Sequence, residues 1–351
     1  MEKFIFTAFL TTELLAYSSS IVTVSEDTLP QPQRFEASQD PSKPPVQIID
    51  LARVALADTL PPRVAEAARS AVAVAGPKGT GSGVKVAPNQ FLTAGHMIMG
   101  DAPLPEGLNT NSPQFNCKGM TIEAALTLPE GDGAAVTQPI TRASGVNHGS
   151  DLASNEPWGM DYASLWVDNS SLAATQVPAV TARYPRYMVG KEIFFVNYES
   201  LKHRPDQPPT RRRSPLYPAY PNAADNFHEP AMYGGIVIKD LGNIMLIVDG
   251  IGRNYSKGHQ DDESRSGSSG GASFDANGNL EGLVVAGPPE KETASQIEQD
   301  YGVRLEGNPA GFTKDSYMVG FVQKITPAMI SEGTTGGLPV AKRCAVPDPQ
   351  N

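Results

Sequence analysis

The sequence reads Gly79-Thr80-Gly81-Ser82-Gly83-Val84-Lys85-Val86, then Pro88-Asn89, then Phe91-Leu92-Thr93-Ala94-Gly95-His96. Runs of β-branched and apolar residues on both sides of a Pro-Asn pair are typical of two strands joined by a turn. The second strand ends at a histidine, whose imidazole exchanges a proton near neutral pH. The stretch therefore predicts a β-sheet that leads directly into a side chain suited to acid–base chemistry.

A second short element lies far downstream and reads Gly267-Ser268-Ser269-Gly270-Gly271. A serine hydroxyl is a poor nucleophile unless a nearby base takes its proton. Glycines beside the serine let the backbone turn sharply and direct N–H groups at an oxyanion. Gly/Ser-rich loops are common, so the element is weak alone. Together with the upstream His96, it indicates acyl transfer with Ser269 as nucleophile.

Such chemistry needs an acid that orients the histidine. Asp161 opens the apolar strand Tyr162-Ala163-Ser164-Leu165-Trp166-Val167 and is the favoured residue. Asp151-Leu152-Ala153 is an alternative because it also reads Asp-apolar-Ala. However, Asn155-Glu156-Pro157 interrupts any strand after Asp151, so Asp161 is the better interpretation.

The order His96, Asp161, Ser269 is that of the trypsin-like (chymotrypsin-fold) serine peptidases, and Asp161-Tyr162-Ala163-Ser164-Leu165 resembles the Asp-Ile-Ala-Leu-Leu segment of that family. The resemblance covers residues 69–330 and rests on three short motifs and the strand pattern. Met97 follows His96 where disulfide-rich members have a cysteine, so the chain is more similar to the disulfide-poor bacterial branch. The resemblance implies a mostly β fold of two packed six-stranded antiparallel β-barrels with a short C-terminal helix.

The resemblance also implies roles for further residues. The backbone N–H groups of Gly267 and Ser269 would form the oxyanion hole. Val285-Ala286-Gly287 would form one wall of the substrate pocket, and Glu263 would lie at its base. A solvated acidic loop is the alternative interpretation of Glu263, and it stays open.

Composition and periodicity divide the chain into five parts. Gly and Pro are abundant, at 33 and 31 residues, and strands with turns dominate from residue 71 onward. Helical spacing occurs at residues 46–60 and 63–69, and a closing helix is expected at 325–330. The expected parts are a signal peptide (1–20), a linker or pro-segment with a helical part (21–68), a first barrel with His96 and Asp161 (69–185), a second barrel with Ser269 (186–335) and a tail (336–351). The Pro-rich stretch 200–230 is expected to be a surface loop.

The net charge limits the possible binding partners, and the N-terminal sequence indicates where the protein is located. The net charge of −10 argues against a nucleic-acid or anionic-membrane partner. Lys3 followed by Phe4-Ile5-Phe6-Thr7-Ala8-Phe9-Leu10 is typical of a secretory signal, although Glu13 interrupts the apolar run. A plain disordered or membrane-touching N-terminus is the alternative. Export would place the protein outside the cell or in a periplasm. Cys117 and Cys344, the only two cysteines, would then pair, and two unpaired cysteines are the alternative.

These observations predict a serine endopeptidase that acts on polypeptides, with no cofactor, no metal and no membrane-spanning helix. A catalytically inactive homologue that binds peptides is the alternative. An α/β-hydrolase esterase is excluded because that fold places the serine before the acid and the histidine. Asp275-Ala276-Asn277-Gly278-Asn279 lacks the closing glutamate of a calcium loop and is better interpreted as a hairpin turn. The oligomeric state is not predicted.

Overall fold

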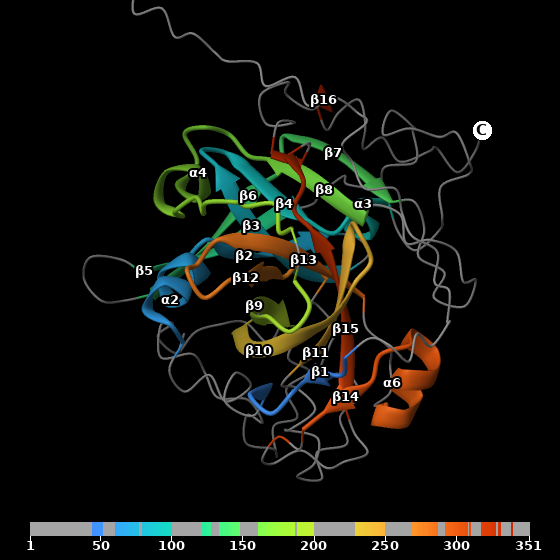
Figure 1. The fold of residues 1–351 in the computed structure, drawn as a ribbon. Coiled ribbons are helices and arrows are strands. Elements are labelled where there is room, and N and C mark those ends of the chain that lie inside the picture. The colour runs from blue at the N-terminus through green and yellow to red at the C-terminus, as the bar shows by residue number, and fades with distance from the viewer. Residues whose placement is uncertain are drawn as a thin grey trace, which may run out of the picture. The chain divides into compact units, whose positions relative to one another are not determined.

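The computed structural model describes residues 44–51, 60–76, 79–99, 121–127, 133–147, 161–186, 188–199, 229–249, 269–286, 292–307, 309, 317–327, 329–330 and 338–339. The expected signal peptide (1–20) and most of the Pro-rich stretch 200–230 lie outside these residues. Strands dominate the described part of the chain, and the helices are short (Figure 1). Pro327, Met329 and Ile330 are helical, as expected near residues 325–330. The prediction of a mostly β fold with a short helix near the C-terminus is confirmed.

The strands of the second half close into a six-stranded antiparallel barrel (Figure 1). Strand β15 shows why the barrel forms, because all seven of its residues are buried. Met318 and Val322 belong to one apolar cluster and Val319 and Phe321 to another, so both faces of the strand are covered. Around the barrel the order is β10 (Glu229–Asp240), β11 (Ile244–Asp249), β15 (Met318–Lys324), β13 (Leu280–Ala286), β12 (Ala272–Phe274) and β9 (Glu192–Glu199).

The strands of the first half form a sheet in which each described pair is antiparallel. The resemblance implied six strands in a barrel, whereas the described pairings link eight strands in an open order. One of them comes from the expected C-terminal tail and pairs with β7. The order is β16 (Leu338–Pro339), β7 (Arg142–Asn147), β8 (Asp161–Trp166), β4 (Gln90–Thr93), β3 (Gly79–Ala87), β2 (Ala71–Gly76), β5 (Thr121–Thr127) and β6 (Gly133–Pro139).

Helices are few in the described residues: α2 (Pro62–Ala68), α3 (His96–Met99), α4 (Leu172–Gln176) and α6 (Ala294–Tyr301). Helix α2 matches the helical spacing at residues 63–69. Helix α6 begins with a capping box in which the Thr293 side chain accepts from the backbone of Gln296, and it ends at Gly302, which has a φ of 63°.

The prediction of a helix at residues 46–60 is wrong for its first residues. Residues Val46–Gln47 form β1, which pairs in parallel with β14 (Leu305–Glu306). Ile48 and Leu51 are fully buried in a cluster with residues of the second barrel, while Ile49 is 62% exposed. The spacing of Ile48 and Leu51 therefore reflects burial against the barrel, and residues 52–59 lie outside the described part of the chain.

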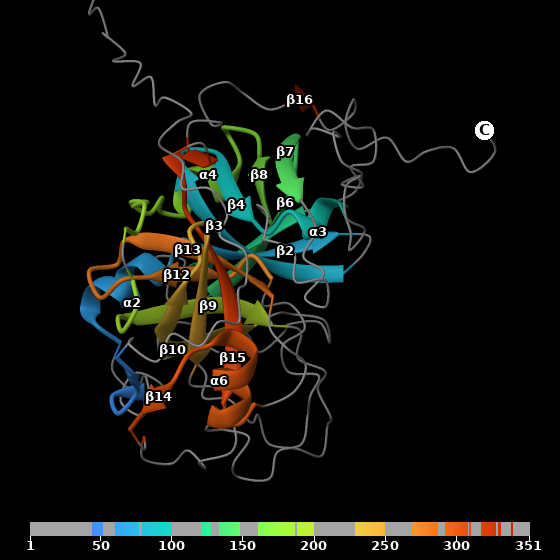
Figure 2. The same cartoon turned by 45° about the vertical axis from the view of Figure 1, so that its right-hand side comes forward.

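The two halves share an apolar core. One cluster combines Leu92 and Tyr162 of the first-half sheet with Val196, Phe274 and Leu283 of the barrel. Hydrogen bonds cross the same boundary, because the Ser82 hydroxyl accepts from the backbone N–H of Tyr198 at 2.7 Å. Figure 2 shows β9 and β12 of the barrel next to β2 and β3 of the sheet. This contact brings the His96 and Ser269 segments to a common boundary.

Glu281 on β13 is a buried carboxyl whose ionisation affects stability. The residue is 5% exposed, and burial raises its pKa to about 7 from 4.5, with a further increase from Asp275. The folded protein therefore binds more protons than the unfolded chain between these two pH values. The stabilising effect of this group is complete below about pH 4.5 and is lost as the pH rises through about 7.

We expect Glu281→Gln to remove this pH dependence. A shift of this size corresponds to about 2 kcal/mol once screening by solvent is allowed for. Urea unfolding of the wild type and the variant at pH 5 and pH 8 measures the effect. From pH 5 to pH 8 the free energy of unfolding should fall more for the wild type than for the variant. An equal change for both proteins would show that Glu281 titrates normally.

Candidate active site

His96 and Asp161 lie together because two paired strands position them. His96 begins α3 three positions after the end of β4, and Asp161 is the first residue of β8. The two strands are antiparallel, with Thr93 opposite Ala163. Both carboxylate oxygens of Asp161 contact the histidine: Oδ2 lies 2.8 Å from His96 Nδ1, and Oδ1 accepts from the His96 backbone N–H at 2.9 Å.

This geometry determines the chemistry available to the imidazole. An ionised carboxylate only accepts hydrogen bonds, so the Nδ1 that faces Asp161 carries a proton. The neutral ring then has its lone pair on Nε2, which can accept a proton from a hydroxyl group. Asp161 is nearly buried, with a side chain 7% exposed, whereas the His96 side chain is 20% exposed. The pair therefore combines a shielded carboxylate with an imidazole that solutes can reach.

Gln323 supports the acid from the second barrel, and sequence reasoning missed it. Its Oε1 accepts from the Asp161 backbone N–H at 3.0 Å, and its Nε2 donates to the carbonyls of Asn243 and Lys324 at 3.0 and 3.2 Å. The contact joins β8 of the first half to β15 of the second. A glutamine inside the apolar run Met318–Lys324 was the available signal, because a buried amide in such a strand needs partners.

Ser269 lies against the segment that carries the histidine. Its backbone carbonyl accepts from the Ser82 N–H at 2.7 Å. The next residues pair with β13, since the Gly270 N–H donates to the Val284 carbonyl and the Val284 N–H to the Gly271 carbonyl, at 2.7 and 2.8 Å. Ser269 is half-buried, so its position combines a fixed backbone with an accessible side chain.

Two glycines allow the loop that carries Ser269 to pack closely against Ser82 and Thr93. Gly270 has a φ of +80°, and a Cβ there would lie 2.1 Å from the Ser82 carbonyl oxygen and 2.2 Å from Thr93 Oγ1. A Cβ on Gly81 would lie 2.6 Å from Met97 Cε and 2.9 Å from the Ser269 carbonyl oxygen. The loop that carries Ser269 therefore packs directly on the backbone next to His96.

We expect Gly270→Ala to destabilise the protein strongly and to displace Ser269. Gly190→Ala is a matched control, because Gly190 has a φ of +81° but no described atom lies within 4 Å of the position that a Cβ would occupy. The control should cost about 1–2 kcal/mol from the left-handed backbone alone. Gly270→Ala adds backbone overlap and should cost at least about 2 kcal/mol more. Denaturant unfolding measures both, and equal losses would show that the close packing at Gly270 is unimportant.

The other predicted site residues divide into described and undescribed positions. Val285 is buried in the same apolar cluster as Ala94, two residues before His96, and Ala286 ends β13. Gly267, Glu263, Gly287 and the alternative acid Asp151 lie outside the described residues, as do Cys117 and Cys344. The described part of the chain thus brings His96 and Asp161 into contact and holds the Ser269 backbone against Ser82.

Metal-binding clusters and membrane-spanning helices are both absent from the described residues. Among them, His, Cys, Asp and Glu nowhere gather in a group of three or more that could hold a metal ion. The same residues include no helix that is long and apolar enough to cross a membrane.

Known proteins resemble this chain in structure rather than in sequence. No family model matches the chain, and none of the curated proteins matches its sequence. Among solved structures, a Glu endopeptidase in complex with MPD aligns over 80% of this chain and 94% of its own, with 17% identity and a TM-score of 0.41. Neuropsin, a serine protease from mouse brain, aligns over 76% and 94%, with 12% identity and a TM-score of 0.41. An inactivated protease paralogue from the scabies mite aligns over 79% and 96%, with 10% identity and a TM-score of 0.40.

Proposed function

We propose that the protein is a serine endopeptidase in which Ser269 is the nucleophile, His96 the general base and Asp161 the orienting acid. The observation that carries the proposal is the contact of both Asp161 oxygens with His96, at 2.8 and 2.9 Å. This contact fixes the ring and its tautomer at once, which an incidental surface ion pair does not do. The backbone bond from Ser82 to Ser269 supports it by holding the serine segment beside β3.

The reaction follows from the three roles. Ser269 Oγ attacks a peptide carbonyl while His96 Nε2 takes the hydroxyl proton, and Asp161 stabilises the imidazolium that forms. The imidazolium then protonates the leaving amine, and the C–N bond breaks to leave an acyl ester on Ser269. Water, deprotonated by His96, cleaves this ester and releases the carboxylic acid. The N–H groups of Gly267 and Ser269 would stabilise the oxyanion in both halves of the reaction.

The substrate would be a polypeptide, and Val285 and Ala286 would line its binding site next to the serine. Secretion, a Cys117–Cys344 disulfide and a pocket base at Glu263 remain part of this proposal. Their basis is the sequence, through the apolar N-terminal run, the pair of cysteines and the acidic loop.

Hydrolysis of denatured casein by the full chain tests the proposal. The wild type should release peptides, and His96→Ala should not. Circular dichroism of both proteins checks that the variant is folded. The full chain is needed because Ile48, Leu51, Val64 and Ala68 are buried, so truncation before residue 70 would remove part of the core. A folded wild type that does not cleave casein would favour the peptide-binding alternative.

A further inference from the structure

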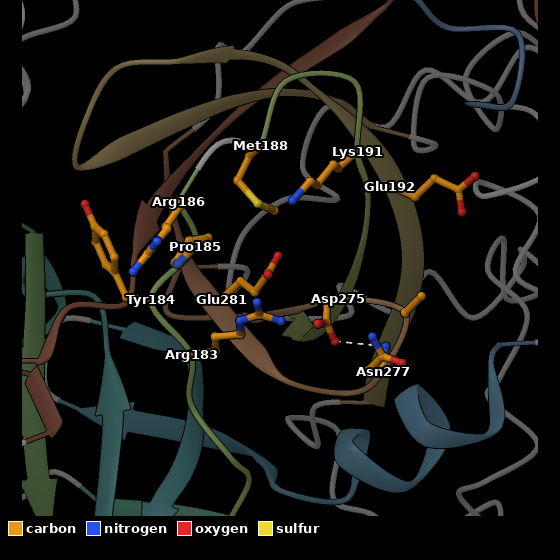
Figure 3. A pocket seen from close by; sticks show the side chains of 11 residues that line it. Arg183, Tyr184, Pro185, Arg186, Met188, Lys191, Glu192, Asp275, Asn277 and Glu281 are labelled. Carbon is orange, nitrogen blue, oxygen red and sulfur yellow. Dashed lines mark hydrogen bonds between the residues drawn. The ribbon is translucent and has the colours of Figure 1, made fainter.

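The second barrel has a pocket that the proposed reaction does not use. Its volume is about 770 Å³, within the range of small-molecule sites. Two stretches supply the walls: the segment that leads into β9, from Arg183 to Glu192, and the hairpin between β12 and β13 (Figure 3). Neither His96, Asp161 nor Ser269 lines it.

Glu281 is the buried acceptor of this pocket. The residue is 5% exposed, and its side chain points into the space between the two walls (Figure 3). Its Oε2 has no hydrogen-bond partner among the described residues. A buried carboxylate oxygen without a donor is unfavourable, so the site is suited to a ligand that supplies an N–H group.

Four charged residues affect the ionisation of Glu281. Arg183, Lys191 and Lys324 lower its pKa, whereas burial and Asp275 raise it. Two of these groups are already engaged: Lys324 donates to Asp240 at 2.6 Å, and Asp275 accepts from Asn277 and Asn279 within its own turn.

Three basic side chains that line the pocket make no such hydrogen bond or ion pair within the described residues. Within the described part of the chain, the side chains of Arg183, Arg186 and Lys191 have no hydrogen-bond acceptor, and all three residues are exposed at the pocket. Figure 3 shows the Lys191 side chain pointing into the pocket and Glu192 pointing away from it. The pocket thus presents exposed cations beside a buried carboxyl oxygen that has no donor among the described residues.

Apolar groups complete the lining. Tyr184, Pro185 and Met188 lie on the same wall as the cations, and Pro185 and Met188 are buried. A ligand would therefore place one apolar group here while its charged ends meet Glu281 and the cations.

We propose that this pocket binds a zwitterionic ligand with an apolar side chain, of the class of α-amino acids and short peptides. The ligand's ammonium group donates to Glu281 Oε2, and its carboxylate accepts from Arg183, Arg186 or Lys191. A simple anion would leave Glu281 without a donor, and a simple cation would be repelled by the three basic side chains.

Calorimetric titration with three probes tests the chemistry of the ligand. The probes are leucyl-leucine, its N-acetyl derivative, which lacks the ammonium group, and its C-terminal amide, which lacks the carboxylate. The full chain carries Ser269→Ala so that the proposed peptidase cannot act on any probe. Leucyl-leucine should bind, and each capped form should bind at least about tenfold more weakly. Equal binding of either capped form, or no binding of leucyl-leucine, would overturn the proposal.

Variants then locate the binding site. Glu281→Gln and Arg183→Gln should each weaken leucyl-leucine binding by about tenfold or more. Glu292→Gln is the matched control for the buried carboxyl, because Glu292 is 8% exposed, its Oε2 has no partner among the described residues, and it lies outside the pocket. Arg304→Gln is the control for an exposed arginine. Binding that survives both pocket substitutions would place the ligand elsewhere, for example at the active site, and would contradict the proposal.

Discussion

Ser269→Ala is expected to reduce casein cleavage by about 10⁶-fold in kcat, because the reaction loses its nucleophile. The fold should persist, since the loop is held by backbone bonds from Ser82 and to Val284 that do not involve the hydroxyl. Initial rates of peptide release, measured alongside the unfolding midpoint, separate the loss of chemistry from a loss of structure.

Ser170→Ala is the control for this substitution. Ser170 is an exposed serine whose hydroxyl donates to Asp168 in a turn, away from the site. Its loss should leave the rate unchanged. If Ser269→Ala kept the wild-type rate while folded, the nucleophile would have to be another residue.

Asp161→Asn is expected to lower kcat by about 10⁴-fold at neutral pH, the scale known for this change in a triad. Asparagine can keep the bond from the His96 backbone N–H through its oxygen. Its NH₂ group then faces Nδ1, which must become an acceptor and leaves the proton on Nε2. A ring in that tautomer cannot take the serine proton.

Asp151→Asn tests the alternative acid on the same peptide substrate. The contacts of Asp161 with His96 predict a change of only a few-fold for this variant. A large loss with Asp151→Asn and a small loss with Asp161→Asn would reverse the assignment and leave the peptidase proposal in place.

The strands that position the site could be predicted because their patterns are local. The apolar run after Asp161 became β8, and the Asn277-Gly278 turn joins β12 to β13, with Gly278 at a φ of 78°. The alternation of apolar and polar residues and the residue types at turns identify strands and hairpins within a few positions of the chain.

The remaining contacts depend on residues far apart in the sequence. Gln323 accepts a hydrogen bond from the Asp161 backbone although the two residues are 162 positions apart. No local sequence pattern predicts which strand a buried amide side chain will contact. Val46–Gln47 and Leu338–Pro339 are too short to show a period, so their pairing with β14 and β7 could not be foreseen. The Glu281 pocket is of the same kind, since its charges come from residues 183–191, 275 and 281.

Labelling with a fluorophosphonate, followed by mass spectrometry of the intact protein and its peptides, tests the central claim most directly. Such reagents trap a serine only when a base activates it. The wild type should take up one adduct, located on Ser269, and His96→Ala should take up none under the same conditions. A folded wild type that stays unlabelled, or an adduct on a different serine, would contradict the assignment of Ser269, His96 and Asp161 as an acyl-transfer site.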